Sequence, residues 1–171
     1  WKKMKRVEII YGGASNEKEI SYLTAKSIYE YIDTNLYNPG LTDWSKFDPD
    51  NFDNETIFFI AVHGEGGEDG KIQTLLENKK RKFTGSSSKS CILTWDKVAT
   101  KRTLIANEIL TPEFKSIKNN EHFDFNNSFF AESEHYFVKP NFNGSSYGIS
   151  KVSDKKFNEA IKEAKNYSSE V

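Results

Sequence analysis

The first segment that could do chemistry is Gly12-Gly13-Ala14-Ser15-Asn16-Glu17, which follows the apolar run Val7-Glu8-Ile9-Ile10-Tyr11. Glycines let a ligand approach the backbone closely, and the free N–H groups at the start of a helix favour anions. Glu17 is a candidate to bind a ligand ammonium group or to complement the helix dipole. A tight turn between a strand and a capped helix uses the same residue types, so both interpretations stay open here.

The second segment is His63-Gly64-Glu65-Gly66-Gly67-Glu68-Asp69-Gly70, which has four glycines and three acids. It follows a continuous apolar run over residues 56–62, a pattern typical of a central parallel strand. Ligands of α/β folds bind at the carboxyl ends of such strands, so the segment predicts part of a binding site. The alternative is a long glycine turn whose acids cap the next helix.

The third segment is Lys139-Pro140-Asn141-Phe142-Asn143-Gly144-Ser145-Ser146-Tyr147-Gly148. A Gly/Ser loop can bend over phosphates with its N–H and hydroxyl donors, and the leading lysine can add an ammonium. The P-loop spacing is absent, so a P-loop is excluded. A plain surface hairpin is the alternative. Asp96-Lys97 with Lys101 carries little information alone, since charges on a helix usually face water.

We expect the first two segments to be loops that connect alternating strands and helices. The pattern predicts strands over 7–11 and 56–62, and helices from about residue 16 and over about 71–78. Apolar residues at helical spacing predict the inner face of the first helix; they include Ile20, Leu23, Ile28 and Tyr31. Residues 35–55 contain no recognisable strand, which predicts that part of the fold is missing near Pro39-Gly40.

The later part of the chain predicts a different mixture of elements. Helices are expected over about 89–95 and 96–107, followed by a strand over 114–117. Strands over 136–140 and 148–152 should form a hairpin around the third segment. A last helix would bury Phe157, Ala160, Ile161 and Ala164. The turn at Gly85 predicts a domain boundary there.

Composition excludes several classes of protein. The 171 residues hold 24 Lys+Arg against 25 Asp+Glu, a formal net charge of −1, which argues against bulk binding of nucleic acid despite a local run of lysines over 79–101. The single cysteine, Cys91, excludes a disulfide framework, and the three histidines show no metal spacing. No apolar stretch could span a bilayer and no signal peptide is recognisable, so the sequence predicts a soluble, cytoplasmic protein.

Taken together and in this order, the motifs resemble the D-alanine–D-alanine ligase family of the ATP-grasp superfamily. The residues that carry the resemblance are 11–21 (YGGASNEKEIS), 63–73 (HGEGGEDGKIQ), Thr84-Gly85-Ser86, Asp96-Lys97, Thr111-Pro112, Val138-Lys139-Pro140, Gly144–Gly148 and Lys151-Val152. Each motif is modest alone, but their ordered combination over about residues 7–171 is specific.

The resemblance implies a role for three residues on the amino-acid side of the site. Glu17 would hold the ammonium of the first D-alanine, and His63 would lie beside the same substrate. Ser145 would hydrogen-bond toward Glu17, so that Glu17 and Ser145 form the implied catalytic pair. The substrates implied are D-alanine and ATP, and the product would serve peptidoglycan synthesis.

The resemblance also implies an ATP side of the site. Lys97 and Lys139 would bind the phosphates, and Ser145, Ser146 and Gly148 would belong to a flap over them. Phosphoryl transfer to a carboxylate needs positioning and positive charge more than covalent help from the protein, which suits these residue types.

The fold class implied is α/β, with a Rossmann-like parallel-sheet domain over 1–85 and an incomplete α+β ATP-grasp subdomain over 86–171. Family members are about twice as long. The Mg²⁺ ligands and the C-terminal catalytic domain are expected in a part that this sequence lacks, so no metal site is predicted and these residues alone should not catalyse ligation. A homodimer is a further implication of the resemblance.

Two alternatives stay open at this point. One is another ATP-grasp ligase that joins a carboxylate to a different amine. The other is a non-catalytic module that binds a nucleotide or a partner protein.

Overall fold

The computed structural model describes residues 4–118, 121, 123, 135–144, 146–153 and 156–171. The chain forms two compact units, residues 1–92 and 93–171, which divide within helix α3 (Ser88–Trp95). Each unit has its own hydrophobic core. The assignment of functional domains on either side of Gly85 remains a prediction.

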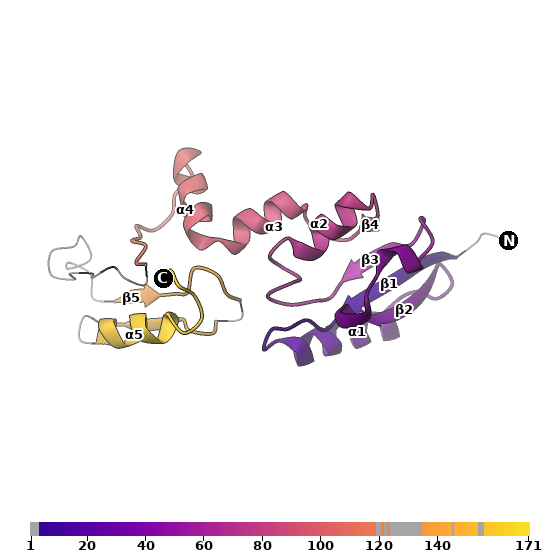
Figure 1. The fold of residues 1–171 in the computed structure, drawn as a ribbon, viewed down its shortest axis with the longest axis horizontal. Helices are drawn as coiled ribbons and strands as arrows, with labels where there is room; N and C mark the ends of the chain where they lie inside the picture. Colours follow the sequence, from indigo (N-terminus) through magenta and orange to yellow (C-terminus); the bar gives the residue numbers. More distant parts are fainter. Residues whose placement is uncertain (1–3, 119–120, 122, 124–134, 145, 154–155) are drawn as a thin grey trace. The chain divides into compact units, whose positions relative to one another are not determined.

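The first unit is an α/β sandwich around a parallel sheet of strand order β2-β1-β3-β4. The strands are β1 (Lys5–Tyr11), β2 (Tyr37–Asp43), β3 (Ile57–Ile60) and β4 (Lys82–Phe83). Helix α1 (Lys18–Tyr31) lies on one face and α2 (Lys71–Asn78) on the other (Figure 1). Strands β1 and β3 carry apolar residues toward both faces, which is why the run over 56–62 shows no alternation.

The sequence prediction for residues 35–55 is wrong. Strand β2 runs through Pro39 and Gly40, so no strand of the sheet is missing there. The strand was hard to recognise because it pairs only with β1 at the edge of the sheet, where proline is tolerated and hydrophobic character is weak. Short 3-10 turns at Trp44–Lys46 and Pro49–Asn51 fill the rest of the segment.

The predicted inner face of α1 is also wrong in part. Ile20, Leu23 and Tyr31 are exposed, whereas Ser21 and Ala25 are fully buried against the sheet. Small side chains at these two positions let α1 lie close to the strands. The Ser21 hydroxyl accepts from the Gly12 N–H at 2.8 Å and donates to the Ala61 carbonyl at 2.7 Å, which joins the ends of β1 and β3.

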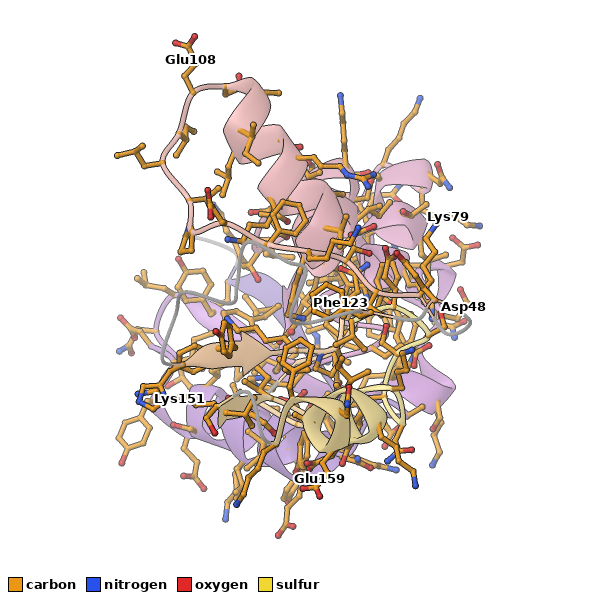
Figure 2. All side chains as sticks on the ribbon, turned by 90° about the vertical axis from the view of Figure 1, so that its left-hand side faces the viewer. Asp48, Lys79, Glu108, Phe123, Lys151 and Glu159 are labelled. Carbon is orange, nitrogen blue, oxygen red and sulfur yellow. The ribbon has the colours of Figure 1, made fainter. Side chains whose placement is uncertain are left out.

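The second unit contains α4 (Lys97–Ala106), a two-stranded antiparallel sheet of β5 (Tyr136–Val138) and β6 (Ser150–Val152), and α5 (Phe157–Ala164). The buried face of α5 includes Phe157, Ala160 and Ala164, as predicted. Figure 2 shows Phe123 on this side of α5 and Glu159 on the outer side. Residues 114–117 form no strand; the pairing that the structure describes there is a bridge between Lys118 and Glu170.

Candidate functional site

In the first unit, two glycine loops meet at the carboxyl ends of β1 and β3. The loop after β1 contains Ser15, whose hydroxyl donates to the His63 carbonyl at 2.9 Å and accepts from the Glu17 N–H at 3.2 Å. Ser15 thereby links the loop that precedes α1 to the loop that follows β3. The parallel sheet places both loops on one edge, as the sequence predicted.

Glu17 is buried, with an exposed fraction of 6%. A Cβ atom at Gly64, whose φ is +69°, would lie 2.7 Å from Glu17 Oε2, so the carboxylate packs directly on the backbone of the second loop. A side chain at Gly64 would displace it. Gly64 therefore allows the Glu17 side chain to lie close to the backbone of the second loop.

His63 is held by α1 rather than by Glu17. Thr24 Oγ1 lies 3.1 Å from His63 Nε2, and Glu68 Oε1 lies 3.8 Å from His63 Nδ1. Both ring nitrogens thus face polar partners, which orients the imidazole. The structure brings Glu17 and His63 to the same loop pair through Ser15. Thr24 had no sequence signal, because it is one threonine on a helix without a motif.

Asp69 shapes the second loop from within. Its carboxylate accepts from the Gly66 N–H and the Lys71 N–H, each at 3.0 Å, and lies 3.2 Å from Lys71 Nζ. Glu65 lies 2.6 Å from the same ammonium, and these two carboxylates raise the pKa of Lys71. Asp69 and Glu65 therefore contact the loop and the first residue of α2. Their presence in the segment is explained by the alternative interpretation, in which the acids stabilise a glycine turn and the start of the next helix.

In the second unit, a cavity of about 490 Å³ is lined by α4, by residues 112–117 and by β5. Lys97 and Lys139 both line it, so the structure brings together two predicted phosphate lysines that lie far apart in sequence. This volume falls within the range of small-molecule sites. Ser146 and Gly148 do not line the cavity, and Ser145 lies outside the described residues.

Lys97 is held at the cavity by the loop after β5. Its ammonium donates to the carbonyls of Asn141, at 3.2 Å, and Asn143, at 2.8 Å. Burial lowers the pKa of Lys97, and the nearby charge of Lys139 lowers it further. Asp96 opposes these effects in part, and a bound anion would oppose them further because it would add negative charge beside the ammonium.

Gly148 and Ser146 have backbone conformations that suit a tight loop. Gly148 has φ +70°, and a Cβ atom there would lie 2.6 Å from the Tyr167 ring and 2.9 Å from Pro140. Ser146 has φ +63°, a region that non-glycine residues rarely adopt. The loop is thus packed tightly at Gly148 and strained at Ser146. Its predicted role over phosphates remains a prediction.

Asn141 was part of a predicted motif, but its structural role could not be read from the sequence. It is 2% exposed. Its side-chain oxygen accepts from the Val98 N–H at 2.8 Å, and its amide donates to Asp96 Oδ1 at 3.0 Å. Asp96 caps α4 by accepting from the Ala99 N–H. Asn141 therefore fixes the start of α4, and with it Lys97, to the end of β5.

Within the residues that the structure describes, no group of three or more His, Cys, Asp and Glu side chains could hold a metal ion. No helix in the described part of the chain is long and apolar enough to cross a bilayer.

Comparison with known proteins identifies relatives over most of the chain. No family model matches. The D-alanine–D-alanine ligase of Polynucleobacter asymbioticus is 35% identical over 160 residues, which cover 88% of this chain and 45% of that protein. The D-alanine–D-alanine ligase of a Marinomonas species is 34% identical over 178 residues, 96% of this chain and 54% of that protein.

The solved structures include the D-alanine–D-alanine ligase of Bacillus anthracis complexed with ATP, with 27% identity and a TM-score of 0.82 over 97% of this chain and 56% of that one. The chain spans about half the length of the curated relatives that it matches. Sequence and fold agree, and they confirm the α/β class and the resemblance seen in the motifs. Over most of its length the chain is therefore similar to D-alanine–D-alanine ligases, of which it spans about half.

Proposed function

We propose that this chain is the part of an ATP-dependent D-alanine–D-alanine ligase that binds the first D-alanine and the phosphates of ATP. The observation that carries the proposal is the cavity of the second unit, which both Lys97 and Lys139 line. The similarity of the chain to D-alanine–D-alanine ligases gives this cavity its proposed ligand. The intact enzyme would form an acyl phosphate from D-alanine and ATP, and a second D-alanine would displace the phosphate to give the dipeptide used in peptidoglycan. Such an enzyme would work in the cytoplasm.

The chemistry of the cavity fits a phosphate chain. Ammonium groups act as point charges on phosphate oxygens, and the partial burial of Lys97 strengthens its interaction because it limits screening by water. Lys97 also donates to two carbonyls, which hold its ammonium at the cavity before any ligand arrives. We assign Lys97 and Lys139 to ATP, and Ser145, Ser146 and Gly148 to the loop that would cover the phosphates.

The two glycine loops of the first unit fit a small amino acid. We assign the buried Glu17 carboxylate to the ammonium of the first D-alanine and His63 to the same substrate, with Ser145 as a partner of Glu17. Mg²⁺ is the metal that the family resemblance implies. Within the described residues, no group of three or more His, Cys, Asp and Glu side chains could hold this ion. We assign the ion to the half of the ligase that this chain does not span. A homodimer is a further proposal that rests on the family alone.

Replacing Glu17 should weaken D-alanine binding. Glu17→Gln removes the charge but keeps the size of the side chain, and a hydrogen bond to a charged group is worth about 2 kcal/mol, so we expect at least about a tenfold loss of D-alanine affinity. Glu19→Gln, at an exposed carboxylate in the first turn of the same helix, is the matched control and should bind as the native chain does.

The measurement is an NMR titration of the 171-residue chain with D-alanine, L-alanine and ATP. ATP affinity should be the same in native protein and in the Glu17→Gln variant. Equal D-alanine affinity in the two proteins would remove Glu17 from the site. Equal binding of D- and L-alanine by the native chain would argue against the proposed substrate.

A further inference from the structure

The cavity of the second unit carries more positive charge than Lys97 and Lys139 provide. Besides Tyr136, the other ionisable side chains that line it are those of Lys101, Lys115, His135 and Glu113. Four lysines thus face one carboxylate in a space of about 490 Å³. Such an excess of cations over acids in one partly open site favours a ligand with several negative charges.

Lys101 lies one helical turn after Lys97 on α4, so the two side chains lie on the same face of the helix. Its ammonium donates to the Pro112 carbonyl at 2.6 Å and lies 5.6 Å from the centre of the Phe114 ring. These contacts hold the side chain across the cavity wall. An ammonium has three N–H donors, and the Pro112 carbonyl uses one, so others remain for a ligand.

The charge of Lys139, a predicted phosphate-binding residue, acts on Lys101. Desolvation lowers the pKa of Lys101, and the charge of Lys139 lowers it further. Burial and then Lys139 act on Lys97 in the same direction. The Lys139 ammonium therefore lies within the field of both lysines of α4. Repulsion among three like charges is relieved when a polyanion binds between them.

The geometry points to Lys101 as a third phosphate-binding lysine, which together with Lys97 and Lys139 selects an extended phosphate chain over a single phosphate. The inference rests on the proposed function, because it concerns the same cavity. Figure 2 shows Glu108 at the far end of α4, pointing away from the rest of the helix. Glu108 therefore does not oppose the charge of Lys101; the acids near the cavity lysines are Asp96, beside Lys97, and Glu113, in the cavity lining.

The test uses inorganic tripolyphosphate, pyrophosphate and orthophosphate as probes for the 171-residue chain, by calorimetry and NMR at low ionic strength. Lys101→Met should weaken tripolyphosphate binding about tenfold, because it removes one charge-assisted contact. The effect on orthophosphate should be within about twofold. Arg102→Met removes a neighbouring exposed charge outside the cavity and is the matched control.

Two further variants separate charge from structure. Lys101→Arg keeps the charge and should restore most of the tripolyphosphate affinity. Lys101→Gln keeps an amide donor toward the Pro112 carbonyl, and its amide spectrum over residues 112–117 reports whether the wall of the cavity is intact. It should bind tripolyphosphate as weakly as Lys101→Met.

The outcomes also separate this inference from the proposed function. Native-like tripolyphosphate binding by Lys101→Gln, with loss of binding in Lys97→Met, would overturn the role of Lys101 and leave the ATP site standing. Failure of the native chain to bind any of the three probes would overturn both. An equal loss for orthophosphate and tripolyphosphate would overturn the selection for an extended chain.

Discussion

Gly67→Ala should destabilise the first unit by on the order of 3 kcal/mol, because the added methyl group has no space. A Cβ atom there would lie 2.1 Å from the Val62 carbonyl oxygen and 2.6 Å from its carbon. Both atoms are backbone atoms just after β3, so the loop or the strand end must move. The Gly67 carbonyl also accepts from the buried Gln73 amide at 2.6 Å, a bond that such a movement would break.

Gly85→Ala is the matched control for this prediction. A Cβ atom at Gly85 would meet nothing within 4 Å, but the residue has φ +107°. Its cost is backbone strain alone, about 1 kcal/mol. Urea unfolding followed by hydrogen exchange of the amides at 57–62 reports the first unit specifically. A cost for Gly67→Ala no larger than that for Gly85→Ala would contradict the packing described for the second glycine loop.

Asn141→Asp should destabilise the second unit by about 3 kcal/mol near neutral pH, although the two side chains have the same shape. The amide nitrogen of Asn141 lies 3.0 Å from Asp96 Oδ1 and 3.4 Å from Glu170 Oε2. The substitution puts a carboxylate oxygen where that donor stands, so like charges would face each other in a buried site. The bond that Asn141 accepts from Val98 would remain possible.

The pH dependence of this effect distinguishes charge from packing. The introduced carboxyl group has its pKa raised in the folded state by burial and by the two acids. It therefore lowers stability above its unfolded-state pKa, and the deficit relative to the native chain shrinks as pH falls toward about 4. Asn143→Asp changes the charge equally at a less buried position and should cost less than about 1 kcal/mol. A deficit for Asn141→Asp that does not change with pH would contradict the assigned hydrogen bonds.

Strong local patterns made parts of the fold predictable. The apolar run over 56–62 predicted a buried strand, which the structure has over Ile57–Ile60, and the glycine segment after it was predicted to lie at the carboxyl edge of the sheet, as it does. The spacing of Phe157, Ala160 and Ala164 predicted the buried face of α5. Strand β2 was missed because Pro39 and Gly40 interrupt it and Thr42 is its one β-branched residue.

The inner face of α1 was mispredicted for a related reason. The positions next to the sheet are Ser21 and Ala25, whose small size matters more than their hydrophobicity. In the candidate site, Glu17, Lys97 and Lys139 could be predicted as binding residues from the motifs that contain them. The convergence of Lys101 on the same cavity and the anchoring of α4 by Asn141 depend on tertiary contacts that have no sequence period.

The most direct test of the central claim is ATP binding by the 171-residue chain, compared between the native protein and the double variant Lys97→Met/Lys139→Met. The account predicts saturable binding to the native chain, with a dissociation constant of about 1 mM or below. The amide shifts should be centred on residues 97–101 and 136–141. Lys89→Met, at an exposed lysine of α3 outside the cavity, should bind ATP as the native chain does. The double variant should lose at least about a hundredfold in affinity. Equal binding by the double variant and the native chain would contradict the account.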